Sequence, residues 1–124
     1  MTATTPTAGA AFAEALAKKD FAAVAALLDP EVDFRGMTPR RFWEAHGADA
    51  VVDEILRQWF EESDDIEELV EVRSGGMADM EHVAYRFRGT NPDGPFVVEQ
   101  QAYLTTEGGR IVWMRVLCSG FRPA

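Results

Sequence analysis

The pattern of apolar and polar residues changes its period once along the chain, close to residue 65. Before that point, apolar residues recur every three or four positions, which is the spacing of one face of a helix. After it, apolar and polar residues alternate, as they do in strands with one buried face. Helices followed by an antiparallel run of strands predict the α+β fold class.

Four segments of the first half predict helices. Asp20 and Thr38-Pro39 are helix-start signals, and Gly47 ends the third helix. The fourth segment has an unbroken apolar stripe made of Val51, Val52, Ile55, Leu56, Trp59 and Phe60. The predicted helices span residues 9–19, 21–28, 38–45 and 48–62, with a short strand at 32–35 that ends at Gly36.

Four strands are predicted in the second half, at residues 66–73, 80–88, 96–105 and 110–121. The turns that separate them are Ser74-Gly75-Gly76, Asn91-Pro-Asp-Gly94 and Glu107-Gly-Gly109. Residues 1–8 show no periodicity and are predicted to be a flexible tail, so residues 9–124 form a single domain.

Two segments resemble parts of a known family. The family's second helix is similar to Lys19-Asp20-Phe21-Ala-Ala-Val24-Ala-Ala-Leu27-Leu28-Asp29-Pro30-Glu31-Val32, and its last strand is similar to Gly109-Arg110-Ile111-Val112-Trp113-Met114-Arg115-Val116. Residues 9–121 therefore resemble the nuclear-transport-factor-2-like, or cystatin-like, superfamily, which includes ketosteroid isomerases, SnoaL-like polyketide cyclases, scytalone dehydratase and limonene epoxide hydrolase. The resemblance implies a cone, in which a curved antiparallel sheet wraps the long helix and N-terminal helices and leaves an apolar pocket.

Alternation along the strands assigns side chains to the inside or the outside of this cone. The inward set is predicted to be Val83, Tyr85, Phe87, Val97, Glu99, Gln101, Tyr103, Thr105, Val112, Met114, Val116 and Cys118. The outward set then includes Phe96, Val98, Leu104, Ile111, Trp113 and Leu117, which is more apolar surface than a monomer leaves in water. The resemblance implies that a homodimer through the outer sheet face covers it.

Ketosteroid isomerases use a tyrosine of the first helix, an aspartate after the first strand and an aspartic acid on the penultimate strand. In this chain those positions fall near Phe12, Gly36 and Gln101, and none keeps the required group. Proton abstraction by that apparatus is therefore not predicted.

Glu99 is the carboxylate that the strand parity places in the pocket. Burial among apolar groups raises the pKa of a carboxylic acid and suits it to acid/base chemistry near neutral pH. Gln101 and Tyr85 are predicted to orient Glu99 or to bind a substrate carbonyl. The alternative is that Glu99 lies at the cone mouth, in solvent or paired with Arg41.

His46 is a further proton-transfer candidate, because it precedes the long helix and lies off the outer sheet face; the alternative is a surface histidine at a helix end. An apolar ligand would be bound by side chains that are otherwise simply core. These candidates are Phe12, Phe34, Trp43, Trp59, Phe87, Tyr103, Met114 and Cys118.

Composition narrows the function classes further. The chain's 12 basic and 21 acidic side chains give a net charge of −9, which argues against nucleic acid or an anionic membrane as partner. A single cysteine and the lack of a signal-peptide pattern predict a cytoplasmic location. His46 and His82 show no metal-ligand spacing and nucleotide-binding motifs are missing, so neither a metal nor a cofactor is expected.

Two functions remain open. In the first, a homodimeric SnoaL-like protein binds a small apolar molecule in its cone and carries out acid/base chemistry of the isomerase, cyclase or dehydratase type. In the second, a domain of the same fold binds a ligand or a partner protein without catalysis. An open pocket around Glu99 favours the first, and a cone filled by Trp43, Trp59 and Phe87 argues against it.

Overall fold

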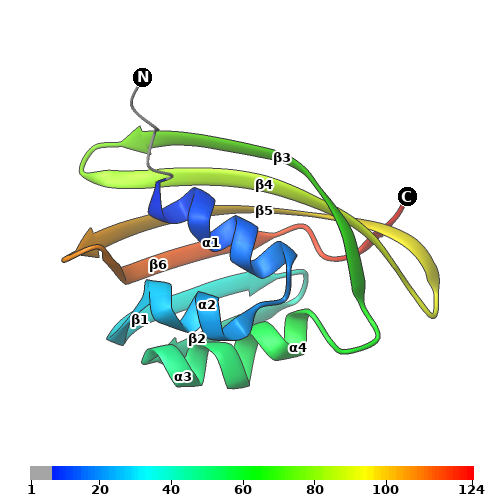
Figure 1. The fold of residues 1–124 in the computed structure, drawn as a ribbon, viewed down its shortest axis with the longest axis horizontal. Coiled ribbons are helices and arrows are strands. Elements are labelled where there is room, and N and C mark those ends of the chain that lie inside the picture. Colours follow the sequence, from blue (N-terminus) through cyan, green and yellow to red (C-terminus); the bar gives the residue numbers. More distant parts are fainter. Residues whose placement is uncertain (1–6) are drawn as a thin grey trace.

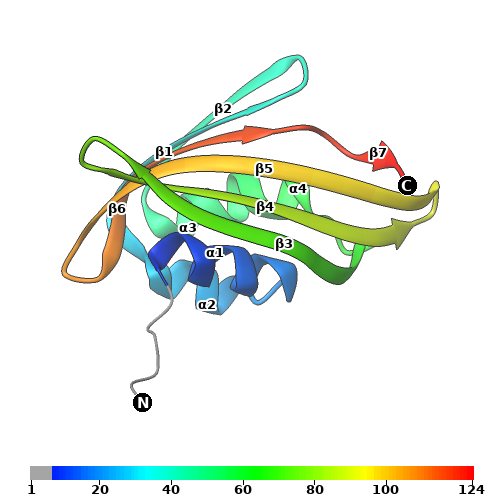
Figure 2. The same ribbon diagram turned by 90° about the horizontal axis from the view of Figure 1, so that it is seen from above.

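The computed structural model describes residues 7–124, so the predicted tail at residues 1–8 lies almost entirely outside the described residues. The helical segments all lie on one face of a curved sheet (Figure 1, Figure 2). None of those segments is long and apolar enough to span a membrane. Their bounds are α1 (Ala8–Ala17), α2 (Phe21–Leu27), α3 (Ala48–Ala50), η1 (Val51–Leu56) and α4 (Arg57–Trp59), the last three being consecutive.

Seven strands form the sheet, in the order β2-β1-β6-β5-β4-β3, with β7 paired to β5. β1 and β6 run parallel, whereas the other pairs are antiparallel. The α+β class with a curved sheet is confirmed. The strands are β1 (Leu28–Thr38), β2 (Arg41–His46), β3 (Asp65–Met77), β4 (Met80–Asn91), β5 (Gly94–Glu107), β6 (Arg110–Cys118) and β7 (Arg122–Pro123).

The helices begin and pack as their sequence indicates. The Asp20 carboxylate accepts a hydrogen bond from the Ala23 N–H at 3.1 Å and so caps α2. The six apolar residues of the predicted stripe from Val51 to Phe60 are all buried. This confirms the prediction that one face of the long helix packs against the core. This helix ends at Trp59, and its middle section η1 is wound as a π-helix.

The helix predicted at residues 38–45 is wrong, because this segment is a β-hairpin. Thr38 pairs with Arg41 across a turn formed by Pro39 and Arg40. Arg40 has a φ of 69°, a left-handed conformation that a helix does not contain. Proline followed by a residue with positive φ makes a tight turn, so Thr38-Pro39, which also fits a helix start, reverses the chain here.

Gly36 does not end the first strand. A Cβ built on Gly36 would lie 2.5 Å from Cη2 of Trp59, so the indole occupies the space that a side chain would need. The glycine therefore allows Trp59 to pack directly on the backbone of β1. Likewise, β3 continues through Gly75 and Gly76, and the chain turns two residues later at Ala78 and Asp79.

The β4–β5 turn determines which side chains face the helices. Asn91 pairs with Gly94, so the loop contains only Pro92 and Asp93, and every odd-numbered residue of β4 lies opposite an even-numbered residue of β5. Inward Val83, Tyr85 and Phe87 are confirmed. The inward orientation predicted for Val97, Glu99, Gln101, Tyr103 and Thr105 is wrong, since the buried residues of β5 are Phe96, Val98, Gln100, Ala102 and Leu104.

The prediction for β6 is confirmed for Met114, Val116 and Cys118, which are buried opposite Leu104, Ala102 and Gln100. It is wrong for Ile111, which is fully buried, whereas Val112 is half-buried. A register shift between Thr105 and Thr106 exchanges the two faces at this end of the pair.

Candidate functional site

Three side chains with polar atoms form a row across the inner face of the sheet. Tyr85 of β4 lies opposite Gln100 of β5, and Gln100 lies opposite Cys118 of β6. Their exposed fractions are 3%, 1% and 6% respectively. We call these three residues the inner row. Its polar atoms are shielded from water by the sheet on one side and the helices on the other.

The hydrogen bonding of the inner row is incomplete. Tyr85 Oη donates to Gln100 Oε1 at 2.6 Å. Gln100 Nε2 has no hydrogen-bond partner within residues 7–124. Turning the amide over would pair Nε2 with the phenol and leave Oε1 alone, so one end of this buried amide lacks a partner in either orientation. An unmet buried polar group costs about 1–3 kcal/mol of stability.

The phenol of the inner row is a donor at neutral pH. Burial raises the pKa of Tyr85 well above 10.0, and the neighbouring Cys118 raises it further. Gln100 does not ionise, and Cys118 Sγ accepts the Gly120 N–H at 3.4 Å. The chain of hydrogen bonds therefore runs from the tyrosine hydroxyl to the glutamine carbonyl and leaves an amide N–H free to donate.

Aromatic and aliphatic side chains fill the space around the inner row. The Phe12 and Phe87 ring centroids lie 6.5 and 5.2 Å from that of Tyr85. Phe12, Phe34, Phe87 and Met114 are fully buried, Cys118 is 6% exposed and Trp59 is 8% exposed, so six of the predicted ligand-binding residues lie inside the cone. They pack together in the hydrophobic core of the domain.

Two tryptophans close one side of this core. Trp59 packs edge-on against Trp43 with centroids 6.0 Å apart, and its buried Nε1 has no partner among the described residues. Trp43 is half-buried and donates from Nε1 to Thr38 Oγ1 at 2.8 Å. The Arg41 guanidinium lies 3.6 Å from the Trp43 ring centroid, so its contact is a cation–π interaction.

Glu99, Gln101 and Tyr103 lie on the opposite, outer face of the sheet. Glu99 Oε1 accepts from Arg86 Nε at 2.8 Å, and the Glu99 side chain is 53% exposed, so its partner is Arg86 rather than Arg41. Gln101 Oε1 is 3.0 Å from His82 Nε2, and the Tyr103 ring lies 4.8 Å from the His82 ring. Tyr85 borders the same small surface hollow as Glu99 and Gln101, but its side chain is buried on the inner face, whereas Glu99 and Gln101 are exposed on the outer face.

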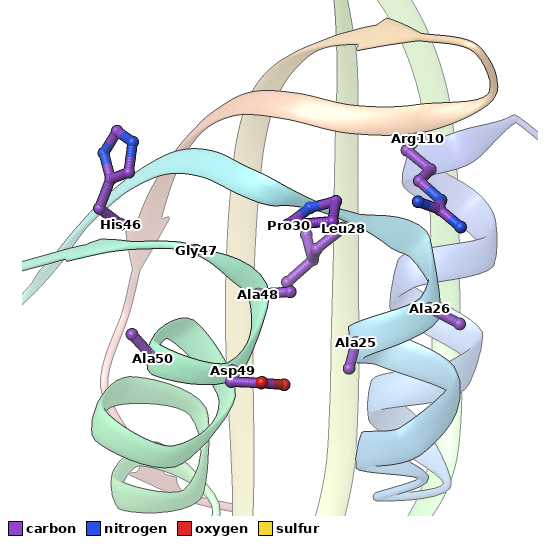
Figure 3. Close-up of a pocket in the computed structure, with 10 residues that line it drawn as sticks. All are labelled: Ala25, Ala26, Leu28, Pro30, His46, Gly47, Ala48, Asp49, Ala50 and Arg110. Carbon is purple, nitrogen blue, oxygen red and sulfur yellow. The ribbon is translucent and has the colours of Figure 1, made fainter.

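His46 is exposed at the end of β2, opposite Asp33. It borders a surface cleft, but Figure 3 shows its ring pointing away from that cleft. His46 therefore joins neither the inner row nor Glu99. Across residues 7–124, no three histidine, cysteine, aspartate or glutamate side chains gather as metal ligands would.

The sequence pattern did not identify Gln100, which lies between the predicted site residues Glu99 and Gln101. The available signal was the length of the β4–β5 turn. An Asn-Pro-Asp-Gly turn with two loop residues sets Tyr85 opposite Gln100, and parity then makes Gln100 inward whenever Tyr85 is inward. The length of the β4–β5 turn therefore identifies Gln100 as the inward-facing residue.

Comparison with known proteins agrees with this architecture. A family model described as a SnoaL-like domain matches residues 10–114. The chain belongs to the SnoaL-like family. No curated protein sequence matches it.

Solved structures similar to this SnoaL-like chain share its fold at low identity. A proposed isomerase from Rhodopseudomonas palustris has 21% identity and a TM-score of 0.69, covering 89% of this chain and 84% of its own. A nuclear-transport-factor-2-like protein from Burkholderia thailandensis has 20% identity and a TM-score of 0.69, covering 93% and 92%. An epoxide hydrolase from M. tuberculosis has 18% identity and a TM-score of 0.66, covering 90% and 80%. The likeness shows that this chain shares the fold of these proteins.

Proposed function

We propose that this SnoaL-like protein binds a small, largely apolar molecule that carries one hydrogen-bond-accepting oxygen, such as a ketone or an ester. The free N–H of Gln100 donates to that oxygen. The observation that carries the proposal is the buried amide with one unpaired end in an otherwise apolar interior. A binding site of this kind combines apolar walls with a few placed polar groups.

The cost of the unpaired amide supports a role in binding. An apolar residue at this position would avoid the desolvation penalty, whereas a ligand oxygen would remove the penalty on binding. The hydrogen bond from Tyr85 to Gln100 Oε1 polarises the amide and strengthens its N–H as a donor. The ligand oxygen therefore gains more from Gln100 than it would from an isolated amide.

Space for the ligand comes from the movement of an aromatic side chain, because the interior is filled. We assign this movement to Trp59. Its ring lies 6.1 Å from Phe34 and 6.0 Å from Trp43, and its buried Nε1 has no partner within the described chain. Rotation of the indole toward solvent would open the core and would also satisfy this N–H with water.

Binding without catalysis is the form of this function that we favour. The charged residue buried among the described positions is Asp64. Its Oδ2 accepts the Glu61 N–H at 3.0 Å and its Oδ1 accepts from Asn91 Nδ2 at 3.1 Å, so the carboxylate holds a corner of the chain together. It is not available as a base inside the cone.

Acid/base chemistry of the isomerase, cyclase or dehydratase type is the second candidate. One observation favours it: the neutral Tyr85 phenol donates to Gln100 Oε1 and polarises the amide, and the amide N–H can then stabilise negative charge that develops on a substrate oxygen. The test is exchange of the α-protons of a bound ketone with deuterated water, followed by NMR. Exchange that is accelerated by the wild type and lost in Tyr85→Phe would favour catalysis over simple binding.

The test of binding compares two adjacent glutamines. A panel of cyclic ketones, esters and hydrocarbons of matched shape is screened by thermal shift against the wild type, Gln100→Leu and Gln101→Leu. A ligand with an oxygen should raise the melting temperature of the wild type and of Gln101→Leu, but not that of Gln100→Leu. The proposal fails if the panel stabilises all three proteins equally or none of them.

We also propose that a second copy of the chain covers the outer sheet face. Phe96, Val98, Leu104 and Ile111 are buried inside and do not contribute to this face. Phe42 of β2, Met37 of β1 and Leu117 of β6 form an exposed apolar row, because Met37 is paired with both of the others. The exposed fractions of Phe42, Met37 and Leu117 are 68%, 43% and 58% respectively. Next to this row, Arg35 is paired with Glu44, so the surface carries both charges and can complement itself across a two-fold axis.

The oligomeric state tests this pairing. Phe42→Glu places a charge at the most exposed residue of the row and should convert dimers to monomers in sedimentation velocity. Met77→Glu is the matched control, since Met77 is 51% exposed at the distant end of β3 and should leave the dimer intact. A monomeric wild type, or a dimer that survives Phe42→Glu, would rule out this interface.

A further inference from the structure

A cleft of about 480 Å³ opens between α2 and the start of the long helix (Figure 3). Its remaining boundary is formed by the beginning of β1 and by the first residue of β6. It lies apart from the inner row and shares no residue with it. The lining residues are Ala25, Ala26, Leu28, Pro30, Gly47, Ala48, Asp49, Ala50, Arg110 and the edge residue His46.

The walls of the cleft are formed mainly by small and apolar residues. Four of the lining residues are alanines. Leu28, 2% exposed, forms a buried floor. Gly47 turns the chain from β2 into the helix with a φ of 95°, and a Cβ there would lie 3.1 Å from Pro30 O. A glycine at this corner keeps the wall thin, so a ligand would meet backbone and methyl groups.

Two charged side chains of opposite sign extend over the cleft. Figure 3 shows Asp49 on the helix side and Arg110 on the strand side, with alanine and proline surface between them. Within the described part of the chain, neither forms an ion pair, whereas Asp53, one turn further along the helix, pairs with Arg57 at 3.2 Å. The cleft therefore presents an unneutralised anion and an unneutralised cation on opposite sides of an apolar surface.

We propose that this cleft binds a small zwitterion, whose carboxylate meets Arg110, whose ammonium group meets Asp49 and whose apolar chain lies on the alanine surface. A guanidinium group pairs with a carboxylate through two parallel hydrogen bonds. The overall charge of −9 repels a simple anion, whereas a zwitterion carries no net charge and needs both side chains. The charges lie on opposite walls, which favours an amino acid whose amine is separated from its carboxylate by several methylene groups.

The test uses 6-aminohexanoate as the probe and hexanoate and hexylamine as its single-charge analogues. Binding is followed by amide chemical shifts in NMR and by calorimetry on the full chain. The zwitterion should bind saturably and shift the amides of Ala25, Ala48 and Asp49. Each analogue should bind at least about tenfold more weakly, because each lacks one charge-assisted contact.

Variants then assign the two contacts. Arg110→Gln and Asp49→Asn should each weaken the binding of 6-aminohexanoate about tenfold, while Arg110→Lys, which keeps the charge, should lose less. The matched controls are Asp53→Asn in the same helix and Arg122→Gln at the exposed C-terminal strand, and both should bind like the wild type. Circular dichroism verifies that each variant is folded.

Three results would overturn the proposal. The first is the absence of saturable binding of 6-aminohexanoate to the wild type. The second is binding of hexanoate or hexylamine as tight as that of the zwitterion. The third is unchanged affinity in both Arg110→Gln and Asp49→Asn, which would show that the two side chains do not hold the probe.

Discussion

Gln100 and Gln101 are adjacent in β5 but have opposite surroundings. Gln100 is 1% exposed, bonded to Tyr85, and has one unpaired amide end, whereas Gln101 is exposed and bonded to His82. The inner face of the sheet packs into an apolar core that contains the Gln100 amide. The outer face carries ion pairs and is exposed to solvent. The same residue type therefore has a structural cost on one face and almost none on the other.

This difference shows where a functional role is credible. Polar pairs on the outer face, such as Arg86–Glu99, exchange with water and need no further explanation. A buried amide that is half satisfied does need one. The number of buried polar groups without a hydrogen-bond partner is therefore a better indicator of a functional role than the total number of polar groups on a face.

The largest contrast between the two faces concerns aromatic residues. Phe87→Ala removes a fully buried ring and should lower the free energy of unfolding by about 3–5 kcal/mol. Phe42→Ala removes a ring that is 68% exposed and should change it by less than about 0.5 kcal/mol in the monomer. Urea denaturation at low protein concentration measures both, and losses of similar size would show that the outer ring is also packed.

The second contrast concerns the hydrogen-bonded pairs Tyr85–Gln100 on the inner face and His82–Gln101 on the outer face. Tyr85→Phe leaves the second end of the buried Gln100 amide without its partner and should cost about 1–3 kcal/mol. The double variant Tyr85→Phe/Gln100→Leu removes the whole polar pair and should be close to wild type or more stable. On the outer face, His82→Phe and Gln101→Leu should each stay within about 0.5 kcal/mol. A double variant as unstable as Tyr85→Phe would show that Gln100 is not a stability cost.

The third contrast is a pH dependence that arises from the inner face. Burial raises the pKa of Tyr85 well above its value of 10.0 in an unfolded chain. Below about pH 10, Tyr85 is protonated in both the folded and the unfolded protein. Above about pH 10, the phenol loses its proton in the unfolded protein first, so the free energy of unfolding falls, by at most about 1.4 kcal/mol per pH unit. Stability measured from about pH 9 to 11 should fall less steeply in Tyr85→Phe than in the wild type. Equal slopes in the two proteins would contradict the burial effect.

The smallest effect is expected at the outer ion pair. Arg86 and Glu99 are 42% and 53% exposed, so a double-mutant cycle with Arg86→Gln and Glu99→Gln should give a coupling of about 0.2–1 kcal/mol. Because the pair is exposed, raising the salt concentration should reduce the coupling. A coupling well above that range, insensitive to salt, would mean that the pair is shielded, as it would be in a dimer.

Local pattern was sufficient where one element decides its own environment. The apolar stripe from Val51 to Phe60 identified the buried face of the long helix, and the Asp20 cap identified the start of α2. One local signal was ambiguous. Thr38-Pro39 fits both a helix start and a hairpin turn, and pairing of the two flanking strands decided for the turn.

The candidate site depended on relations between elements. Alternation places Glu99 and Gln101 on one face and Gln100 on the other, but it does not say which face is inside. The turn at Pro92 and Asp93 settled this through the register of β4 against β5. A shift of one residue exchanged the predicted catalytic set for Gln100, because neighbouring side chains of a strand point in opposite directions.

The sequence by itself determined the fold class, the buried face of the long helix, the inward face of β4 and the resemblance to the SnoaL-like family, because each depends on periodicity or motif within one segment. Tertiary structure alone decided that Trp59 fills the space over Gly36, that the core is closed around the inner row, and that Asp49 and Arg110 lie across one cleft. These features arise from contacts between residues far apart in the chain, and no local pattern specifies the position of one element against another.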